Sequence, residues 1–414
     1  MNESFKNHLL DIFPLDIAHS LINSLSGPEE RAALLNTDKI SDEMFLSLFK
    51  SATPHPFVPH AYYYDKEIDD LGKHELHDFG AFYLQDPSAM IPASLLPVTN
   101  SDLVLDMCAA PGGKTIQVSR TMNNEGIIIA NDISAARAKE LSRNVERMGR
   151  KNIIVTNNNF EKFVPNLQNT FDAILLDAPC SGSGMGRKIP AILDEWSLAK
   201  VQKFASLQQV MIVNAYKYLK PGGTLIYSTC SFSPEENEEI ISHLLANTDA
   251  ELISVPTING EYRPQNRPET LYLLPSLFKG EGQFIAMIKK TGEKIITFSK
   301  QTSTKFVYRD ITYLLPTNYA IPALFYLVRP GLELGRQERY GFVPSHHYAR
   351  ASTSDESYAL TNEEKNRYLS GETLQVRGDL PNGYHVVSYQ GFAIGLVKNV
   401  NGVLKNHYPK GLRR

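Results

Sequence analysis

The sequence contains few cysteines, and its other absences narrow the kinds of protein that it can encode. Three cysteines occur among 414 residues, without the spacing of a disulfide framework or the paired CxxC motifs of a zinc ribbon. No apolar run is long enough to cross a membrane, and the charged N-terminal residues lack the hydrophobic segment of a secretory signal. We therefore expect a cytoplasmic protein without membrane contacts, and we expect a monomer.

A strong charge of one sign is also missing. The formal net charge is −3 and the isoelectric point is about 6.4, which is not the charge of a general nucleic-acid binder. Any contact with nucleic acid must therefore rely on local positive patches. The length predicts two to four domains, and a hydrophobic content of 42% is enough for a sizeable core.

The middle of the chain alternates short apolar runs with helical patterns, which is typical of a doubly wound parallel sheet. Residues 1 to about 75 show helical spacing, and the region after about 290 has the short strands and regular glycines of a β-rich module. Two further segments, 250–255 and 283–290, are expected to pair at the edge of the sheet. The predicted strands are 103–106, 126–131, 153–156, 171–177 and 224–228. One predicted helix begins near 115, and three more cover 135–148, 198–219 and 234–245.

A glycine-rich turn, Cys108 to Thr115, follows the strand that ends at Asp106. Glycines allow a ligand to approach the backbone, and the amides of the next helix face that ligand, so the turn predicts a nucleotide-like cofactor site. It matches neither the phosphate-binding P-loop nor the dinucleotide G-x-G-x-x-G motif. Asp132, at the end of the second strand, suits ribose hydroxyls, as in S-adenosylmethionine. The alternative is a structural turn that binds nothing.

Cys180 and Cys230 follow neighbouring strands of the predicted sheet, and Asp177 ends the strand before Cys180. The carboxyl ends of parallel strands meet at one edge, so both thiols can face one pocket. Taken singly, each is best explained as an inert core cysteine. Together with Asp177 and a methyl-donor pocket they match the needs of cytosine methylation, in which a thiolate adds to C6 and activates C5. The residues alone leave open which thiol attacks.

Three motifs resemble those of the Sun/Nop family of RNA cytosine-5 methyltransferases. They are Asp106-Met107-Cys108-Ala109-Ala110-Pro111-Gly112-Gly113-Lys114-Thr115, Asp177-Ala178-Pro179-Cys180-Ser181-Gly182 and Tyr227-Ser228-Thr229-Cys230-Ser231. The stretch from Gly80 to Met90 also resembles the segment that precedes the cofactor strand in this family. The resemblance covers residues of about 75 to 290.

The resemblance implies a role for each site residue. Cys230 would be the attacking nucleophile, Cys180 would help to release the product, and Asp177 would lie between the cofactor and the target base. In place of the family's usual Asp after the third strand the chain has Asn159, which is expected to contact the adenine. The residues implied to hold S-adenosylmethionine are Cys108, Ala109, Ala110, Pro111, Gly112, Gly113, Lys114, Asp132, Asn159 and Asp177.

The C-terminal third resembles the RsmF branch of bacterial ribosomal RNA methyltransferases, through residues 331–335, 344–349 and 368–414. This implies a substrate in 16S ribosomal RNA, in its decoding region, or in the 30S subunit. The expected fold is α/β, a Rossmann-like doubly wound methyltransferase sheet with a helical N-terminal domain and a β-rich, PUA-like C-terminal region. The predicted domains are an N-terminal RNA-binding domain (1–95), the methyltransferase domain (96–293), a first C-terminal domain (294–366) and a PUA-like RNA-binding module (367–414).

Arg187, Lys188 and the basic segment 405–414 are candidate RNA contacts, although a solvated tail explains the last equally well. Tyr62 to Tyr64 fit a packed aromatic cluster better than a stacking platform, and His346-His347 has no partner at a metal-ligand spacing. Two other functions compete with the first. One is the same chemistry on transfer RNA, and the other is a catalytically silent factor that binds ribosomal RNA during assembly.

Overall fold

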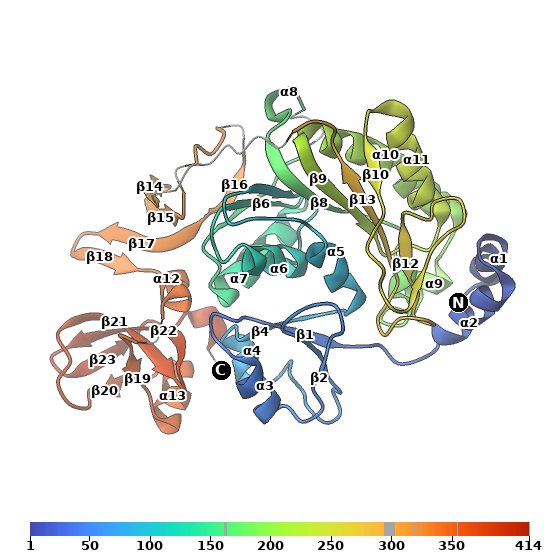
Figure 1. The fold of residues 1–414 in the computed structure, drawn as a ribbon. Coiled ribbons are helices and arrows are strands. Elements are labelled where there is room, and N and C mark those ends of the chain that lie inside the picture. The colour runs from blue at the N-terminus through green and yellow to red at the C-terminus, as the bar shows by residue number, and fades with distance from the viewer. Residues whose placement is uncertain (161–163, 294–302, 318, 324, 354, 414) are drawn as a thin grey trace.

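The computed structural model describes residues 1–414 except 161–163, 294–302, 318, 324, 354 and 414 (Figure 1). At its centre the described residues form a ten-stranded sheet in the order β11-β12-β13-β9-β8-β5-β6-β7-β16, with β10 paired to β13 beside this path. The parallel strands are β5 (Leu103–Asp106), β6 (Ile127–Asn131), β7 (Ile153–Thr156), β8 (Phe171–Asp177) and β9 (Leu219–Thr229). The strands that run antiparallel to their neighbours are β10 (Glu251–Ile253), β11 (Glu261–Tyr262), β12 (Leu271–Leu273), β13 (Gln283–Lys289) and β16 (Leu327–Pro330).

Helices cover both faces of this sheet (Figure 1). On one face Val104 and Ile128 pack with residues of α6 (Gly113–Thr121) and α7 (Ala135–Met148). On the other, Leu105 and Ile129 share a core with α10 (Leu198–Tyr218) and α11 (Glu238–Asn247). Strand residues therefore alternate between two apolar cores, which is why these strands are apolar throughout. The predicted doubly wound sheet is confirmed, as is the pairing of residues 250–255 with 283–290. The shorter helices are α5 (Ile91–Ser94), α8 (Val164–Leu167) and α9 (Ala191–Asp194).

The N-terminal region differs from the helical expectation. Helices α1 (Glu3–Ile12), α2 (Leu15–Ser24), α3 (Asp42–Leu48) and α4 (Glu75–Asp78) form, but a four-stranded sheet lies among them. Its strands are β1 (Ala32–Leu35), β2 (Thr53–Pro54), β3 (Ala61–Tyr63) and β4 (Phe82–Gln85). All four residues of β1 are buried, a run too short for a helix, and they pair with β3 and β4. Tyr62 and Tyr63 are buried in this sheet, as a packed cluster requires.

The helices α1 and α2 lie apart from that sheet and pack on the core of the central ten-stranded sheet (Figure 1). The Asn2 side chain donates hydrogen bonds of 2.9 Å to the backbone oxygens of Asp194 and Trp196. The Phe5 ring lies 5.5 Å from the Trp196 ring between centroids. The N-terminal helices therefore pack against the segment around Asp194 and Trp196, which follows the Cys180 loop in the sequence.

The C-terminal part contains two small sheets. One has the order β14-β15-β17-β18 and the other the order β19-β21-β22-β23-β20, with helices α12 (His346–Ala351) and α13 (Asn362–Leu369) beside them. The strands are β14 (Thr304–Tyr308), β15 (Ile311–Leu315), β17 (Leu332–Glu338), β18 (Gly341–Pro344), β19 (Tyr358–Ala359), β20 (Leu374–Gln375), β21 (Gly383–Tyr389), β22 (Phe392–Val400) and β23 (Val403–Asn406). Strand β16 falls within the predicted 294–366 domain but pairs with β7, so that range contributes to two sheets. No helix in the described part of the chain combines the length and apolar character needed to cross a bilayer.

Candidate active site

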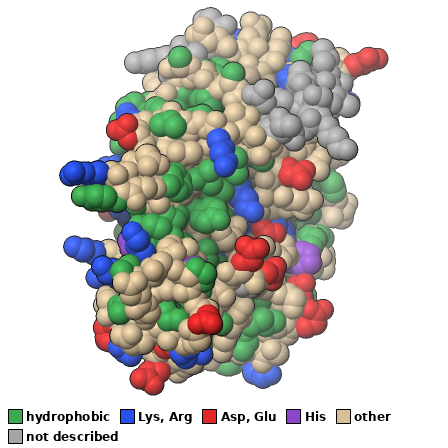
Figure 2. All heavy atoms as spheres, turned by 90° about the vertical axis from the view of Figure 1, so that its left-hand side faces the viewer, with side chains coloured by type: hydrophobic (Ala, Val, Ile, Leu, Met, Phe, Trp, Pro, Cys, Tyr) green, Lys and Arg blue, Asp and Glu red, His purple; other side chains and the backbone are tan. Residues whose placement is uncertain are grey.

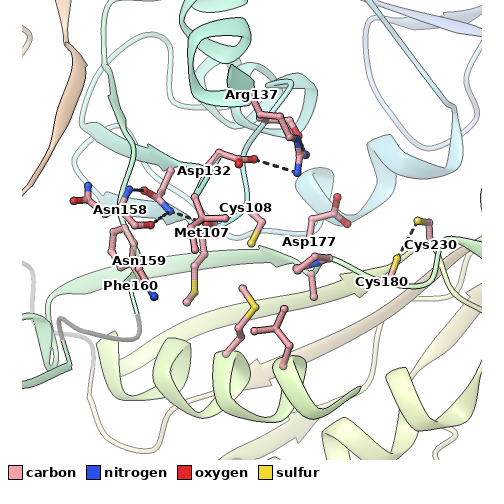
Figure 3. A pocket seen from close by; sticks show the side chains of 17 residues that line it. Met107, Cys108, Asp132, Arg137, Asn158, Asn159, Phe160, Asp177, Cys180 and Cys230 are labelled. Carbon is pink, nitrogen blue, oxygen red and sulfur yellow. Dashed lines mark hydrogen bonds and ion pairs between the residues drawn. The ribbon is translucent and has the colours of Figure 1, made fainter. Parts of the chain in front are cut away.

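A cavity of about 300 Å³ lies at the carboxyl ends of the parallel strands. Its walls come from the loops after β5, β6, β7, β8 and β9, so residues far apart in the sequence meet there (Figure 3). Cys108 and Asp132 line its middle, with Asn158 and Asn159 at one end and Asp177 and the two thiols toward the other. This edge is where parallel α/β sheets bind ligands.

The glycine-rich turn brings its backbone close to its neighbours on one side of the cavity. Gly112 has a φ of +116°, a left-handed conformation that favours glycine, and it precedes the first residue of α6. A Cβ on Gly113 would lie 2.7 Å from Oε1 of Gln85 and 3.0 Å from the Tyr83 ring, so a larger residue there would displace these side chains. The segment from Gly80 to Met90 thus lies against the glycine-rich turn through Tyr83 and Gln85. Of the turn, Cys108 and Ala110 line the cavity.

Asp132 offers an acceptor to a ligand. Its Oδ1 accepts a hydrogen bond of 2.8 Å from the amide of Ser134, whereas its buried Oδ2 has no hydrogen-bond partner among the residues that the structure describes. Arg137 Nη1 lies 3.3 Å from Oδ2 in an ion pair that lacks hydrogen-bond alignment, and that side chain is half exposed. A buried carboxylate oxygen that lacks a hydrogen-bond donor is suited to accept hydrogen bonds from the hydroxyl groups of a ligand.

Asn131 organises the end of the cavity that is opposite the thiols. Its side-chain oxygen accepts from the Thr156 hydroxyl at 2.9 Å and from the Asn158 amide at 2.8 Å. Its side-chain nitrogen donates to the Asn158 carbonyl at 3.0 Å. These bonds fix the loop after β7, so that Asn159 and Phe160 line the cavity. Asn131 and Asn158 were missed by the sequence analysis because an Asn near a strand end carries no distinctive pattern.

Asp177 is held by three side chains at the opposite end. Its Oδ2 accepts a hydrogen bond from Lys114 at 2.8 Å, and its Oδ1 accepts from Ser228 at 2.7 Å and from Gln283 at 3.2 Å. Burial of Lys114 opposes its charge, but the Asp177 carboxylate outweighs this and raises the pKa of Lys114. Lys114 therefore reaches the cavity through Asp177 and is not part of the wall.

The sulfur atoms of Cys180 and Cys230 lie 3.1 Å apart and form a hydrogen bond (Figure 3). Both side chains are partly exposed and line the cavity. The hydrogen bond that Cys180 shares with Cys230, together with burial, raises the pKa of the Cys180 thiol well above its usual value, so Cys180 is a neutral thiol at pH 7. Burial likewise raises the pKa of Cys108, which makes it a neutral wall residue.

A buried carboxylate, Glu236, joins the two loops that carry these thiols. It accepts hydrogen bonds from the amide and the hydroxyl of Ser181, next to Cys180, and from the hydroxyl of Ser231, next to Cys230. Gln208 donates a further hydrogen bond at 3.1 Å. The side chain is fully buried, and burial raises its pKa despite these donors. The sequence predicts a helix start here but not this role, because Ser181 is remote in the sequence and a turn separates Ser231 from Glu236.

The remaining predicted residues lie elsewhere. Arg187, an expected RNA contact, instead forms a buried ion pair of 3.1 Å with Glu281 and donates to the Gly280 carbonyl. Lys188 is exposed, and its contact with RNA stays a prediction. The imidazole of His347 is buried between the Arg150 carbonyl at 3.0 Å and the Arg329 guanidinium at 2.9 Å, which makes it structural. Among the described residues no group of three or more His, Cys, Asp or Glu side chains is arranged to hold a metal.

Three family models match the chain. Residues 93–289 match "16S rRNA methyltransferase RsmB/F", residues 1–87 match the "N-terminal domain of 16S rRNA methyltransferase RsmF", and residues 356–414 match the "Methyltransferase RsmF PUA domain". The strands β14 to β18 lie outside these three ranges.

Curated relatives extend over nearly the whole chain. "Ribosomal RNA small subunit methyltransferase F" of Erwinia tasmaniensis is 32% identical over 99% of this chain and 96% of its own length. The protein of the same name from Shewanella loihica is 31% identical over 100% of this chain and 96% of its own length.

Solved structures share the fold of the central region. A methyltransferase homolog protein from Pyrococcus horikoshii has a TM-score of 0.60 at 29% identity, over 70% of this chain and 100% of that one. NSun6 from Pyrococcus horikoshii has a TM-score of 0.65 at 23% identity, over 70% of this chain and 99% of that one.

Proposed function

Because the chain belongs to the family of ribosomal RNA small subunit methyltransferase F, we propose that it methylates carbon 5 of a cytosine in 16S ribosomal RNA, with S-adenosylmethionine as donor. The observation that carries the choice of position is the pair of thiols 3.1 Å apart at the Asp177 end of the cavity. Carbon 5 of cytosine is not nucleophilic until a nucleophile has added to C6, and a thiol is suited to that addition. The substrate is the RNA or the 30S subunit that contains it.

The cavity fits the proposed donor. Cys108 and Ala110 of the turn before α6 line the cavity, and Oδ2 of Asp132 suits ribose hydroxyls. Cys108, Asn159 and the rest of the turn from Ala109 to Lys114 complete the proposed binding set, Lys114 through its bond to Asp177. When bound, S-adenosylmethionine supplies the methyl group.

Cys230, Asp177 and Cys180 each have a separate role in the reaction of the base. The Cys230 sulfur forms a bond to C6, and the electron pair of the C5=C6 bond becomes available at C5, where the new carbon–carbon bond forms. Asp177, held by Lys114, Ser228 and Gln283, supports the addition at N3 of the ring. Loss of the C5 proton to a base restores the double bond and expels the Cys230 sulfur. Cys180 lies within hydrogen-bond distance of that departing sulfur, and we assign to it the assistance of release.

The test is methyl transfer from labelled S-adenosylmethionine to purified 30S subunits, 16S RNA and bulk transfer RNA, followed by base analysis. We expect label in 5-methylcytosine of the 16S RNA or the 30S subunit. Label confined to transfer RNA would retain the chemistry and overturn the substrate. Label in another nucleoside would overturn the chemistry, and no label despite cofactor binding would favour a silent assembly factor.

A further inference from the structure

The strand β16 forms one edge of the central sheet and, with Phe325 and Tyr326 before it, makes up the edge segment, residues 325–330. None of the three family models covers this segment. Figure 2 views the molecule from the side on which this edge and the β14-β15-β17-β18 sheet lie. Pairing with β7 places Leu327 opposite Thr156, directly before the loop 157–160. Because part of that loop lines one end of the cavity, the edge segment lies next to the candidate cofactor site.

Hydrogen bonds join the backbone of Tyr326 to this loop. Asn158 Oδ1 accepts from the Tyr326 amide at 2.9 Å, and Asn158 Nδ2 donates a long hydrogen bond of 3.5 Å to the Tyr326 carbonyl. The same carbonyl accepts from the Asn157 amide at 3.0 Å. The side-chain amide of Asn158 thus pairs with both backbone groups of Tyr326, as a neighbouring strand would. These contacts continue the pairing of β7 with β16 into the loop.

The backbone and the side chain of Asn158 are held from different sides. Its backbone amide and carbonyl bind the Asn131 side chain at 2.8 and 3.0 Å. These two bonds leave its side chain to find partners elsewhere, and the residue is only 7% exposed. A buried amide side chain without hydrogen bonds is costly, so the backbone of Tyr326 meets a need that Asn131 does not. The loop is therefore fixed both by β6 and by the edge segment.

The ring of Phe325 supports the loop at a second point. Phe325 is buried, and its ring centroid lies 5.9 Å from that of Phe160, which lines the cavity. The Tyr218 ring also packs against Phe160 at 5.9 Å, and its hydroxyl donates to the Phe160 carbonyl. Of the described residues that line the cavity, none belongs to the edge segment. The edge segment therefore contacts the cavity wall from outside, through Asn158 and Phe160.

We propose that the edge segment is a positioning element of the cofactor site, which sets the places of Asn158 and Phe160 and hence the affinity for S-adenosylmethionine. The inference rests on the proposed function. Walls that are already in place before a ligand arrives need not be ordered at the cost of binding energy, so a loosened loop lowers affinity. Asn158 and Phe160 lie at the end of the cavity away from Cys180 and Cys230 (Figure 3), so the chemistry at the thiols should persist.

The test compares two substitutions at one position by calorimetric titration of the full chain with S-adenosylmethionine. Tyr326→Pro and Tyr326→Ala both remove a ring that is 57% exposed, but only Tyr326→Pro also removes the amide hydrogen donated to Asn158. The position directly precedes an edge strand, where proline is tolerated. We expect Tyr326→Pro to bind the cofactor about threefold to tenfold more weakly than Tyr326→Ala, the range for one lost hydrogen bond.

A double-mutant cycle and a second pair of variants identify the path. Asn158→Ala removes the acceptor, so Tyr326→Pro should weaken cofactor binding much less in that background than in the native chain. Phe325→Ala, which removes the ring beside Phe160, should also weaken cofactor binding. Phe325→Leu refills most of that space and should restore it. The Phe325 variants decide the question if Tyr326→Pro does not fold.

Kinetics separate positioning from a general loss of structure. Tyr326→Pro should raise the KM for S-adenosylmethionine, while kcat at saturating cofactor and the KM for RNA stay within about twofold of those of Tyr326→Ala. Equal cofactor affinity in Tyr326→Pro and Tyr326→Ala would overturn the inference, as would native affinity in Phe325→Ala where Tyr326→Pro does not fold. A higher KM for RNA at unchanged cofactor affinity would also overturn it and would assign the segment to RNA. A native chain that binds no S-adenosylmethionine would refute the proposed donor and the inference with it, whereas native and variant chains that all bind it equally would overturn the inference alone.

Discussion

Cys180 and Cys230 share a hydrogen bond between sulfur atoms 3.1 Å apart, although 50 residues separate them in the sequence. The Cys180 thiol keeps its proton because the partner sulfur and burial both raise its pKa. A neutral Cys180 thiol can donate a hydrogen bond to the Cys230 sulfur as that sulfur leaves the base. This fits the proposed division of roles, with Cys230 attacking and Cys180 assisting release.

Replacing the proposed nucleophile should abolish turnover. Cys230→Ala removes the only atom assigned to attack C6, so we expect methyl transfer to fall on the order of a thousandfold or more. Binding of S-adenosylmethionine, measured by calorimetry, should persist. Cys108→Ala is the matched control, because it deletes a thiol from the cavity wall and should weaken cofactor binding while turnover remains. Turnover by Cys230→Ala at the native rate would refute the assignment.

Removal of the second thiol should stop the reaction at a later step. In Cys180→Ala, addition of Cys230 to the base proceeds and release stalls, so a covalent protein–RNA adduct should accumulate on denaturing gels. The double variant Cys180→Ala/Cys230→Ala should form none, which shows whether the bond is to Cys230. If Cys180→Ala gives no adduct although it binds RNA and cofactor, Cys180 does not act in release.

Glu236 should control how well the two thiols are positioned. Glu236→Gln replaces an oxygen by an NH2 group that faces donors from Ser181 and Ser231, which we expect to cost about 1–3 kcal/mol of unfolding free energy. It should also make adduct accumulate, because the thiols no longer keep their spacing. Glu238→Gln is the control, since Glu238 is another buried carboxylate, which accepts from Tyr272 at 2.7 Å. Equal adduct levels in Glu236→Gln and Glu238→Gln would show that Glu236 contributes to stability but does not position the thiols.

Asp106 should make stability depend on pH. Burial raises its pKa from 3.8 to about 7, although the Thr115 hydroxyl donates to it at 2.6 Å. The folded state thus prefers the protonated acid. Its contribution to the unfolding free energy is complete below about pH 4 and is lost as the pH rises through 7. Asp106→Asn should flatten this decline, measured by urea unfolding of the cofactor-free protein from pH 4 to 8. Parallel curves for the two proteins would contradict the shift.

The sequence predicted the central sheet well because each of its units is local. A strand, a turn and a helix succeed one another within about thirty residues, and the predicted helix 135–148 coincides with α7. The N-terminal sheet was missed because β1 pairs with β4, about fifty residues away, and a run of four apolar residues is too short to identify a strand from its pattern. The residues within a short strand do not indicate which distant strand it will pair with.

The same limit applies within the candidate site. The thiols, Asp177 and the glycine turn stand in distinctive motifs, and the structure brings Cys108, Asp132, Asp177, Cys180 and Cys230 into one cavity. The groups that hold them in place, such as Asn131 and Glu236, are ordinary residues whose function arises only from remote contacts. The prediction that Arg187 contacts RNA was wrong for a related reason. A basic residue that follows a motif gives no indication in the sequence that it will form a buried ion pair with Glu281.

The pairing of β16 with β7 has a consequence for synthesis. The chain emerges from the ribosome N-terminus first, so β5 to β9 can assemble while residues 327–330 have yet to be made. Until they emerge, β7 is an open edge whose backbone donors and acceptors have no partner on one side. If β5 to β9 assemble at that stage, the sheet exposes one free edge of β7, a buried strand of the complete fold, to any neighbour. Chaperone binding or intermolecular pairing would then be directed to β7 until β16 pairs with this edge.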